Sequence, residues 1–409
     1  MRSRIVLLRN ANIWGREGRW DIRIADTRIA EVGRGLAAAA GDGAVEDGAV
    51  EDLDGALVIP GLVDAHCHVD KTLWSGDWVP HTPAPDLVAR VTHEEENRHR
   101  YGVPSVDNST ALLREMAASG TTRIRTHTDV DPGVGLRGVE NVAQAARNLD
   151  GRIAVEQVAF PQRGMLRKPG TQELLEEAVR SGAVQAVGGI DPAGLDNDPV
   201  RHLDVIFGIA ERHGAKLDIH LHDGGSLGAW EFRQIIERTK ALGLQGRVTI
   251  SHAFALSDAV EERRPALVEE LVAGLAANGI SLTTVAPSRG QLPIKAMRAA
   301  GGVVGAGNDG VRDLWSPFGD GRMLDRAMML AHALGGRLDE DLELALHTAT
   351  FGGARVLGLG DGEFGVVEGA VADLVALPVR NAAEAVVSRP VPSLVVAGGR
   401  VGARHGALV

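Results

Sequence analysis

The feature that most constrains the fold of this chain is a regular alternation of short apolar segments with amphipathic segments, from about residue 61 to residue 354. Each apolar segment is followed by a stretch of roughly 10–15 residues with helical periodicity. Strands that alternate with such helices form parallel sheets, because the helix returns the chain to the start of the next strand. Around eight units in about 290 residues match the size of a TIM barrel. The sequence therefore predicts an α/β fold with a (β/α)8 TIM barrel over residues 61–354.

The two ends of the chain have a different pattern. Short β-rich segments occur before residue 60 as IVLLRNANIW, DIRIADTRIAEVG and LVIPG, and after residue 355 as AVADLVAL, AVVSR and SLVVAGGRV. Neither end is long enough to bury a core alone. We therefore expect residues 1–60 and 355–409 to pair into one small composite β-sandwich. A near-literal repeat, DGAVE at 42–46 and again at 47–51, predicts a flexible surface connection.

Composition and charge exclude several classes of partner. Apolar residues make up 44% and charged residues 24%, which is typical of a soluble globular protein. The net charge of −11 argues against nucleic acid or an anionic membrane as a partner, because both require a basic surface. Cys67 is the single cysteine, so no intrachain disulfide can form. The apolar run near the N-terminus is too short for a signal peptide, and we expect a cytoplasmic protein.

Histidines and an aspartate follow several of the predicted barrel strands. His66 and His68 end the first strand, and period-two alternation places both imidazoles on one side with Cys67 on the other. His220 ends AKLDIH, and Asp309 ends the run VVGAGND. Barrel active sites form at this carboxyl end of the strands. We therefore predict that His66, His68, His220 and Asp309 bind one divalent metal, with His127 and His252 as further histidines at strand ends.

Three nitrogens and one carboxylate leave a coordination position open, which is typical of a catalytic metal. Bound zinc lowers the pKa of its water to about 7 and so provides hydroxide at neutral pH. We expect zinc, with iron as the alternative.

With these residues established, the chain resembles the amidohydrolase superfamily over almost its whole length. The segments PGLVDAHCHVDKT, VAFPQRG, RVTISH and NDGVRDLWSPFGDGRML are similar to the cytosine deaminase-like branch. This resemblance implies a barrel with a composite β-sandwich and one metal, usually zinc or iron. It also implies that Asp309 takes a proton from the attacking water, while His252 stabilises the developing charge.

Departures from the branch pattern concern the substrate. Cytosine deaminases have a glutamate three residues after the third histidine, where this chain has Asp223, and a second aspartate after the metal ligand, where it has Gly310. Cytosine is therefore disfavoured. Branch members that remove isopropylamine from N-isopropylammelide, a triazine, are similar to this chain at Lys71 and His222. His222, Asp223 and Lys71 are all candidates for passing a proton to the departing nitrogen.

Four further residues are expected to contact a planar ring. The family uses a glutamine at the end of the third barrel strand, and Gln162 and Glu156 are the candidates here. Trp315 and Trp74 follow strand ends and are candidates for stacking on the ring or closing a lid.

The expected function is hydrolysis of a carbon–nitrogen bond, to an amino or alkylamino group, in a small heterocyclic substrate such as a pyrimidine or triazine. The alternative is a cyclic amide, ureide or N-acyl amidohydrolase of the same superfamily. Those enzymes often use two metals and a lysine on the fourth strand, and AVQAVGGIDP has no lysine. A non-catalytic metal-binding barrel protein is the third possibility. The sequence does not decide whether the protein forms a homo-oligomer.

Overall fold

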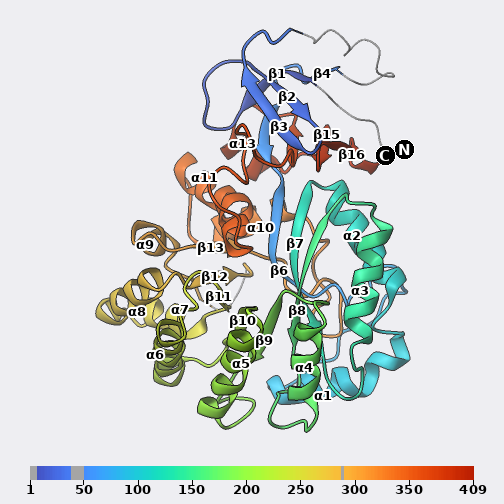
Figure 1. Cartoon of the computed structure of the whole chain (residues 1–409). Helices are drawn as coiled ribbons and strands as arrows, with labels where there is room; N and C mark the ends of the chain where they lie inside the picture. The colour runs from blue at the N-terminus through green and yellow to red at the C-terminus, as the bar shows by residue number, and fades with distance from the viewer. Residues whose placement is uncertain (1–6, 38–49, 287–289) are drawn as a thin grey trace.

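Eight parallel strands form a nearly closed barrel in the computed structural model of this protein, which describes residues 7–37, 50–286 and 290–409 (Figure 1). They are hydrogen-bonded in sequence order, and a bridge between Cys67 and Asp309 brings the first and last strands together. The barrel strands are β6 (Leu62–Cys67), β7 (Thr121–Asp129), β8 (Ala154–Phe160), β9 (Ala186–Ile190), β10 (Lys216–His220), β11 (Val248–Ser251), β12 (Ser281–Thr284) and β13 (Val304–Ala306). The predicted TIM barrel is thus confirmed.

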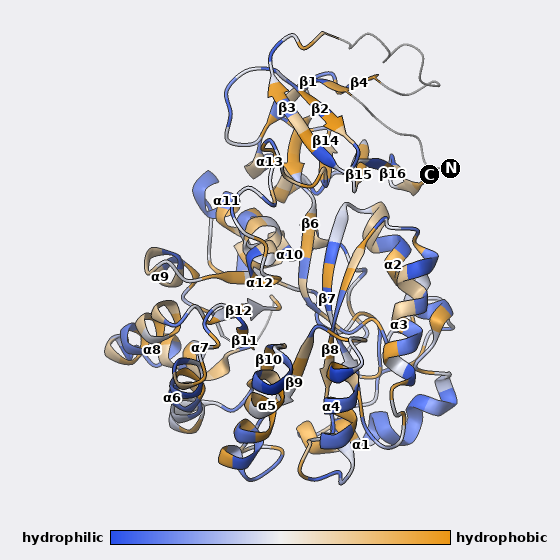
Figure 2. Cartoon of the chain, in the orientation of Figure 1, coloured by the Kyte–Doolittle hydropathy of each residue, from blue (hydrophilic) through white to orange (hydrophobic). Residues whose placement is uncertain are grey.

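Helices follow the strands and pack their apolar faces on the barrel, with polar faces outward (Figure 2). Local sequence explains where they begin: Asp198 caps α5 by accepting the N–H of Arg201, and Pro199 occupies the first turn. The helices of the barrel region are α1 (Leu87–Asn97), η2 (Arg98–Tyr101), α2 (Val106–Ala118), α3 (Arg137–Asn148), α4 (Thr171–Arg180), α5 (Pro199–His213), α6 (Gly225–Ala241), α7 (Phe254–Glu261), α8 (Pro265–Ala277), α9 (Ile294–Ala299), α10 (Met323–Ala333), α11 (Asp339–His347), η3 (Thr348–Gly352) and α12 (Gly353–Val356).

The two chain ends form a separate mixed sheet above the barrel in Figure 1. Its strands are β1 (Leu7–Ile13), β2 (Trp20–Ala25), β3 (Arg28–Gly33), β4 (Val50–Asp52), β5 (Leu57–Pro60), β14 (Leu374–Leu377), β15 (Leu394–Ala397), β16 (Arg400–Arg404) and β17 (Ala407–Leu408). β5 joins the two halves, because it pairs with β1 on one edge and with β14 on the other. The pairing of the two ends is confirmed, as one continuous sheet around a shared apolar core; the exact domain boundaries stay a prediction.

One expected strand is wrong. AVVSR lies in helix α13 (Ala382–Ser388), because the Asn381 side chain accepts the N–H of Glu384 at 2.8 Å and so caps the helix. Most of the DGAVE repeat, residues 42–49, lies outside the described residues. No helix in the described ranges has the length and apolar character needed to cross a membrane.

Candidate metal centre and active site

The predicted metal-binding residues meet at the carboxyl end of the barrel strands. His66 is the fifth residue of β6, His68 follows that strand, and His220 is the last residue of β10. His252 directly follows β11, and Asp309 follows β13 and is hydrogen-bonded through its N–H to the carbonyl of His66. The parallel arrangement brings them together because all these strands end at the same rim.

The ligand atoms of this cluster lie within a metal-binding distance of one another. Nε2 of His68 is 3.3 Å from Nε2 of His220 and 3.2 Å from Oδ1 of Asp309. Nε2 of His66 is 3.7 Å from the same carboxylate oxygen. Nε2 of His66 is buried without a hydrogen-bond partner in the described ranges. Since buried polar atoms are normally satisfied, this donor set fits one divalent metal.

Hydrogen bonds fix the tautomers of two histidines for metal binding. Nδ1 of His68 faces the carbonyl of His127 at 3.1 Å, so this nitrogen carries the proton and Nε2 keeps its lone pair. Nδ1 of His66 lies 2.9 Å from Oγ of Ser251, whose hydroxyl is donated to Asp218 at 2.6 Å. Ser251 must therefore accept from His66, which also leaves Nε2 free to bind a cation.

Burial keeps the imidazoles neutral. It lowers the pKa of His68 and of His220 well below the ordinary value. Burial alone would raise the pKa of Asp309, but hydrogen bonds with His66 and His68 hold it well below its usual range. Neutral imidazoles and an ionised carboxylate are the forms that bind a metal. The Asp309 side chain is still 40% exposed, so it is accessible from the pocket.

His127 adds a fourth imidazole to the predicted set. The ligand atoms of His66, His68, His127 and His220 all lie within 4.8 Å of one another, and those of His66, His252 and Asp309 form a second such group. Nε2 of His127 is 3.2 Å from Oδ1 of Asp218, beneath the metal cluster. Burial lowers the pKa of His127 to about 4, so it is neutral as well.

A buried arginine supports this cluster from below. Nη1 of Arg125 donates to Asp218 and to Thr249, both at 3.0 Å, and Nε donates to Glu156 at 2.7 Å. Asp218 in turn accepts the hydroxyl of Ser251, which holds His66. The charge of Arg125 is thus connected to His66, a predicted metal ligand, through three hydrogen bonds.

Replacing Arg125 with methionine is expected to destabilise the fold by about 3–5 kcal/mol, because the fully buried carboxylate of Asp218 loses its arginine. Urea unfolding would measure this change. Arg238→Met is the matched control: its ion pair with Asp204 lies on the surface and contributes about 0–1 kcal/mol. If the two variants lose equal stability, Arg125 does not have the structural role assigned here.

The backbone is strained where the cluster meets solvent. His252, Ala253 and Asp309 have φ values of 68°, 55° and 60°, in the left-handed region that non-glycine residues rarely adopt. Such strain is found at active sites, where the surrounding structure enforces it. Here it turns two functional side chains toward the same cavity.

The cavity above the cluster has a volume of about 690 Å³. Its lining includes residues 84–87 from the insertion after β6, and residues 315, 316, 318 and 319 from the loop after β13. Trp315 holds these two segments together, because its Nε1 donates to the buried Glu94 carboxylate of α1. Ile190, Phe254, Val285 and Met329 add apolar wall.

Lys71 and Gln162 form a polar pair in this cavity. Nζ of Lys71 donates to Oε1 of Gln162 at 2.7 Å and is 3.0 Å from Oδ1 of Asp129. Burial alone would lower the pKa of Lys71, but carboxylates, with Asp129 first, raise it above its ordinary value. Lys71 is therefore a fixed cation. Because lysine only donates, Oε1 of Gln162 faces it and the amide N–H groups point elsewhere.

His222 is oriented by a carboxylate that the sequence patterns did not single out. Nδ1 of His222 lies 2.8 Å from Oδ2 of Asp191, and its backbone N–H donates to Oδ1 of the same residue at 2.6 Å. Burial alone would lower the pKa of His222, but Asp191 raises it above the ordinary value. The imidazole lines the cavity beside His252, with ring centroids 4.2 Å apart.

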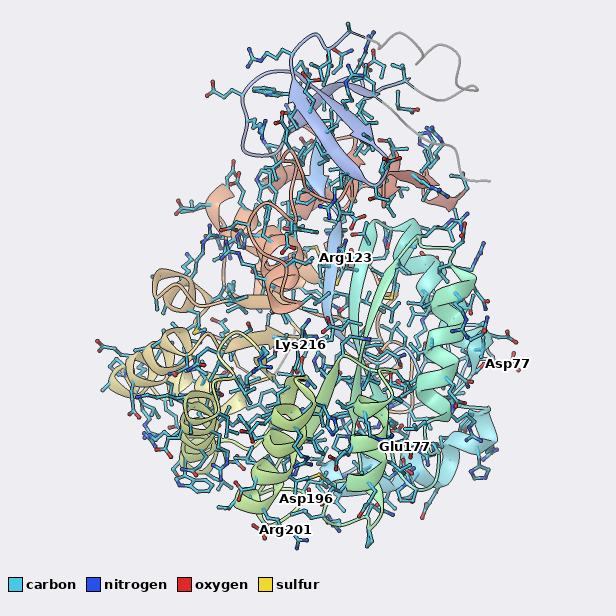
Figure 3. All side chains as sticks on the ribbon, in the orientation of Figure 1. Asp77, Arg123, Glu177, Asp196, Arg201 and Lys216 are labelled. Atoms are coloured by element: carbon cyan, nitrogen blue, oxygen red, sulfur yellow. The ribbon has the colours of Figure 1, made fainter. Side chains whose placement is uncertain are left out.

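Three candidate residues lie outside the cavity. Oδ2 of Asp223 accepts the N–H of Gly194 at 2.9 Å. Trp74 makes a cation–π contact with Arg312, whose Cζ lies 4.2 Å from the centroid of the indole ring. Glu156, which was expected to contact the substrate, is the third residue of β8, and its carboxylate accepts hydrogen bonds from Arg125 and Lys216 outside the cavity. Figure 3 shows Lys216 toward the terminal sheet, with Asp196 beyond the opposite end of the strands.

Sequence reasoning missed several residues of the site. Asp129 and Asp191 end or directly follow β7 and β9, so the strand-end rule that selected the histidines would have found them. Glu94 had no such signal, since it lies on a helix of the insertion and its carboxylate is bound by Trp315 from the loop after β13.

Comparison with known proteins places the chain in a family. The amidohydrolase family matches residues 97–403, which is more than half of the chain. The N-isopropylammelide isopropyl amidohydrolase of Pseudomonas sp. (strain ADP) is 30% identical over 410 residues, covering 97% of this chain and 96% of the relative. The predicted resemblance to this superfamily is therefore confirmed.

Two solved structures are similar throughout. N-isopropylammelide isopropylaminohydrolase from Burkholderia multivorans ATCC 17616 has a TM-score of 0.91 and 43% identity, covering 99% of this chain and 100% of that one. A 5-methylcytosine deaminase from Klebsiella pneumoniae is 24% identical and has a TM-score of 0.82. The match covers 97% of this chain and 96% of that one, and the two proteins share the fold. This chain belongs to the amidohydrolase family and is a metal-dependent hydrolase of carbon–nitrogen bonds other than peptide bonds.

Proposed function

We propose that this enzyme hydrolyses the bond between a ring carbon and an exocyclic amino or alkylamino nitrogen in a small oxo-substituted heterocycle, a triazine or a pyrimidine. The observation that supports the proposal is that His68, His220 and Asp309 of the metal cluster, His222, and the Lys71–Gln162 pair all line one cavity. The relatives named for N-isopropylammelide support the triazine class.

The metal is proposed to be a single zinc ion held by His66, His68, His220 and Asp309. When bound, zinc supplies Lewis-acid activation of a water nucleophile. Nitrogen-rich donor sets with one carboxylate suit zinc or iron more than magnesium or calcium, which prefer oxygen ligands. β9 (Ala186–Ile190) contains no lysine, which supports one metal over a carboxylated-lysine pair.

The proton transfers are assigned to the residues that face the cavity. Asp309 accepts a proton from the water that attacks the ring carbon. His252, whose pKa burial holds well below the ordinary value, acts as a neutral hydrogen-bond donor to the developing oxygen charge. Nε2 of His222 donates a proton to the departing nitrogen while Asp191 holds Nδ1. The carbon–nitrogen bond then breaks, and the products are the oxo-substituted ring and a free amine.

Lys71 and Gln162 are assigned to substrate binding. Two protons of Nζ are used by Gln162 and Asp129, which leaves the third for a ring carbonyl. The amide N–H groups of Gln162 provide a second donor to the same side of the ring. Since Lys71 is a fixed cation, it is a poor proton donor, and His222 is the better candidate for the shuttle.

The apolar walls support an alkylated leaving group. Ile190, Phe254, Val285 and Met329 line a cavity of about 690 Å³, which is at least as large as many small-molecule sites. An amino group alone would not use this space. We therefore favour alkylamino over amino substrates.

The test is a metal analysis followed by an ammonia- and amine-release screen over triazines, pyrimidines and pterins with the metal-loaded enzyme. We expect about one zinc per chain and alkylamine release with kcat/KM of roughly 10⁴ M⁻¹s⁻¹ or more. Turnover of cyclic ureides or N-acyl amino acids alone would favour the amide-hydrolase alternative. A metal with no exchangeable water and no turnover would favour a non-catalytic metal-binding protein.

A further inference from the structure

Asp313 is a buried carboxylate of the cavity that the reaction steps above do not use. It lies four residues after the metal ligand Asp309, is 8% exposed and lines the same cavity. Its Oδ1 accepts the backbone N–H groups of Trp315 at 2.7 Å and of Ser316 at 2.8 Å. Within the described part of the chain, Oδ2 accepts no hydrogen bond. Oδ2 is not among the fully buried unpartnered atoms, so it is accessible from the cavity and can accept a hydrogen bond from a ligand there.

Gly310 explains why this oxygen reaches the substrate side of the cavity. A Cβ atom built on Gly310 would lie only 2.0 Å from Oδ2 of Asp313, and 2.8 Å from its Cγ. The carboxylate therefore occupies the space that any side chain at position 310 would fill. Gly310 directly follows Asp309 and also lines the cavity. Because Gly310 has no side chain, the carboxylate of Asp313 can lie directly beside the residue that follows the metal ligand Asp309.

We propose that Oδ2 of Asp313 accepts a hydrogen bond from a ring N–H of the substrate. This inference rests on the proposed function and narrows its substrate class. Lys71 and Gln162 offer donors for a carbonyl, and Asp313 offers an acceptor for an N–H. A ring with a carbonyl and an N–H, as in the lactam form of hydroxytriazines and pyrimidinones, provides both partners. Asp313 is therefore a specificity-determining residue, with no part in the proton transfers.

The sharpest test is Asp313→Asn in the metal-loaded enzyme. The asparagine oxygen can still accept the two backbone N–H groups, so the loop is kept, while the amide nitrogen replaces Oδ2 and turns the acceptor into a donor. We expect kcat/KM to fall by about 10–100-fold, mainly through KM, with metal content unchanged. We also expect the wild-type enzyme to reject an analogue methylated at the recognised ring nitrogen, and the variant to lose most of this discrimination.

Three further variants complete the design. Gly310→Ala places a methyl group against Oδ2 of Asp313 and should lower kcat/KM as Asp313→Asn does. The double variant, Gly310→Ala with Asp313→Asn, should have a kcat/KM little lower than that of either single variant, because both substitutions act on one contact. Asp320→Asn is the matched control, since its carboxylate caps the N–H of Arg322 in the same loop outside the cavity.

The outcomes separate this inference from the proposed function. Wild-type kcat/KM and selectivity in Asp313→Asn would overturn the role of Asp313 while leaving amine release intact. If Asp313→Asn loses metal or fold, unchanged selectivity in Gly310→Ala would overturn it as well. Failure of the wild-type enzyme to release an amine from any heterocycle would instead overturn the proposed function.

Discussion

Replacing His220 with alanine is expected to remove both the metal and the activity. His220 is the last residue of β10, and its Nε2 lies 3.3 Å from Nε2 of His68 inside the buried cluster. Loss of this donor removes one of the four assigned ligands, and the three that remain are held in positions that suit a four-ligand site, so they should bind the metal much more weakly. Because Lewis-acid activation contributes several kcal/mol, kcat/KM should fall by roughly 10³-fold or more. Metal analysis by mass spectrometry and the amine-release assay measure the two effects.

His332→Ala is the matched control for this variant. His332 is exposed on α10, far in sequence from every assigned ligand, and its loss should change neither metal content nor turnover. If His220→Ala retains full metal content, the ligand assignment is wrong. In that case His127, whose ligand atoms lie within 4.8 Å of the same cluster, is the first replacement to examine.

Replacing His222 with glutamine is expected to lower kcat by about 10²–10⁴-fold while the metal stays bound. Glutamine keeps a side chain of similar length that can hydrogen-bond to Asp191, but it cannot donate a proton to the departing nitrogen. KM should change little, because the proposed ring contacts are made by other residues of the cavity, Lys71 and Gln162. Steady-state kinetics with metal analysis separate these effects.

Two companion variants make this result interpretable. His213→Gln replaces a surface histidine paired with Glu176 and should leave kcat unchanged. Asp191→Asn keeps the hydrogen-bonding shape around His222 but removes the charge that raises its pKa, so a smaller loss of kcat is expected. A wild-type kcat in His222→Gln would exclude His222 as the shuttle and would return attention to Lys71.

Much of the fold could be predicted because it depends on periodicity. The alternation of apolar strands and amphipathic helices identified all eight barrel strands, and the short length of each β-rich end required the two ends to pair. AVVSR was the exception, since its β-branched residues favour a strand and the deciding contact is the cap by Asn381 outside that segment. Local propensity is a weak guide where one capping hydrogen bond selects the helix.

The metal cluster could be predicted for the same reason, since every assigned ligand lies at or just after the end of a strand, and parallel strands end at one rim. The substrate contacts could not. Glu156 and Gln162 are six residues apart around the end of one strand, and only the position of the barrel ends shows that Gln162 enters the cavity while Glu156 binds Arg125 and Lys216. Whether a side chain near the end of a strand enters the cavity depends on how the barrel packs, and the local sequence pattern does not contain this information.

The sequence by itself thus determined the barrel, the joining of the chain ends, a cluster of histidines and an aspartate that suits a divalent metal, and the hydrolase family. Tertiary structure alone decided which loop residues complete the site. The Asp223 carboxylate accepts the N–H of Gly194, and the Trp74 ring contacts the guanidinium of Arg312. The Asp191 carboxylate orients the imidazole of His222. Gly310 and Asp313 show the physical reason. The glycine matters because Oδ2 of Asp313 occupies the space of its missing Cβ, and this contact exists only after the loop that follows β13 has folded.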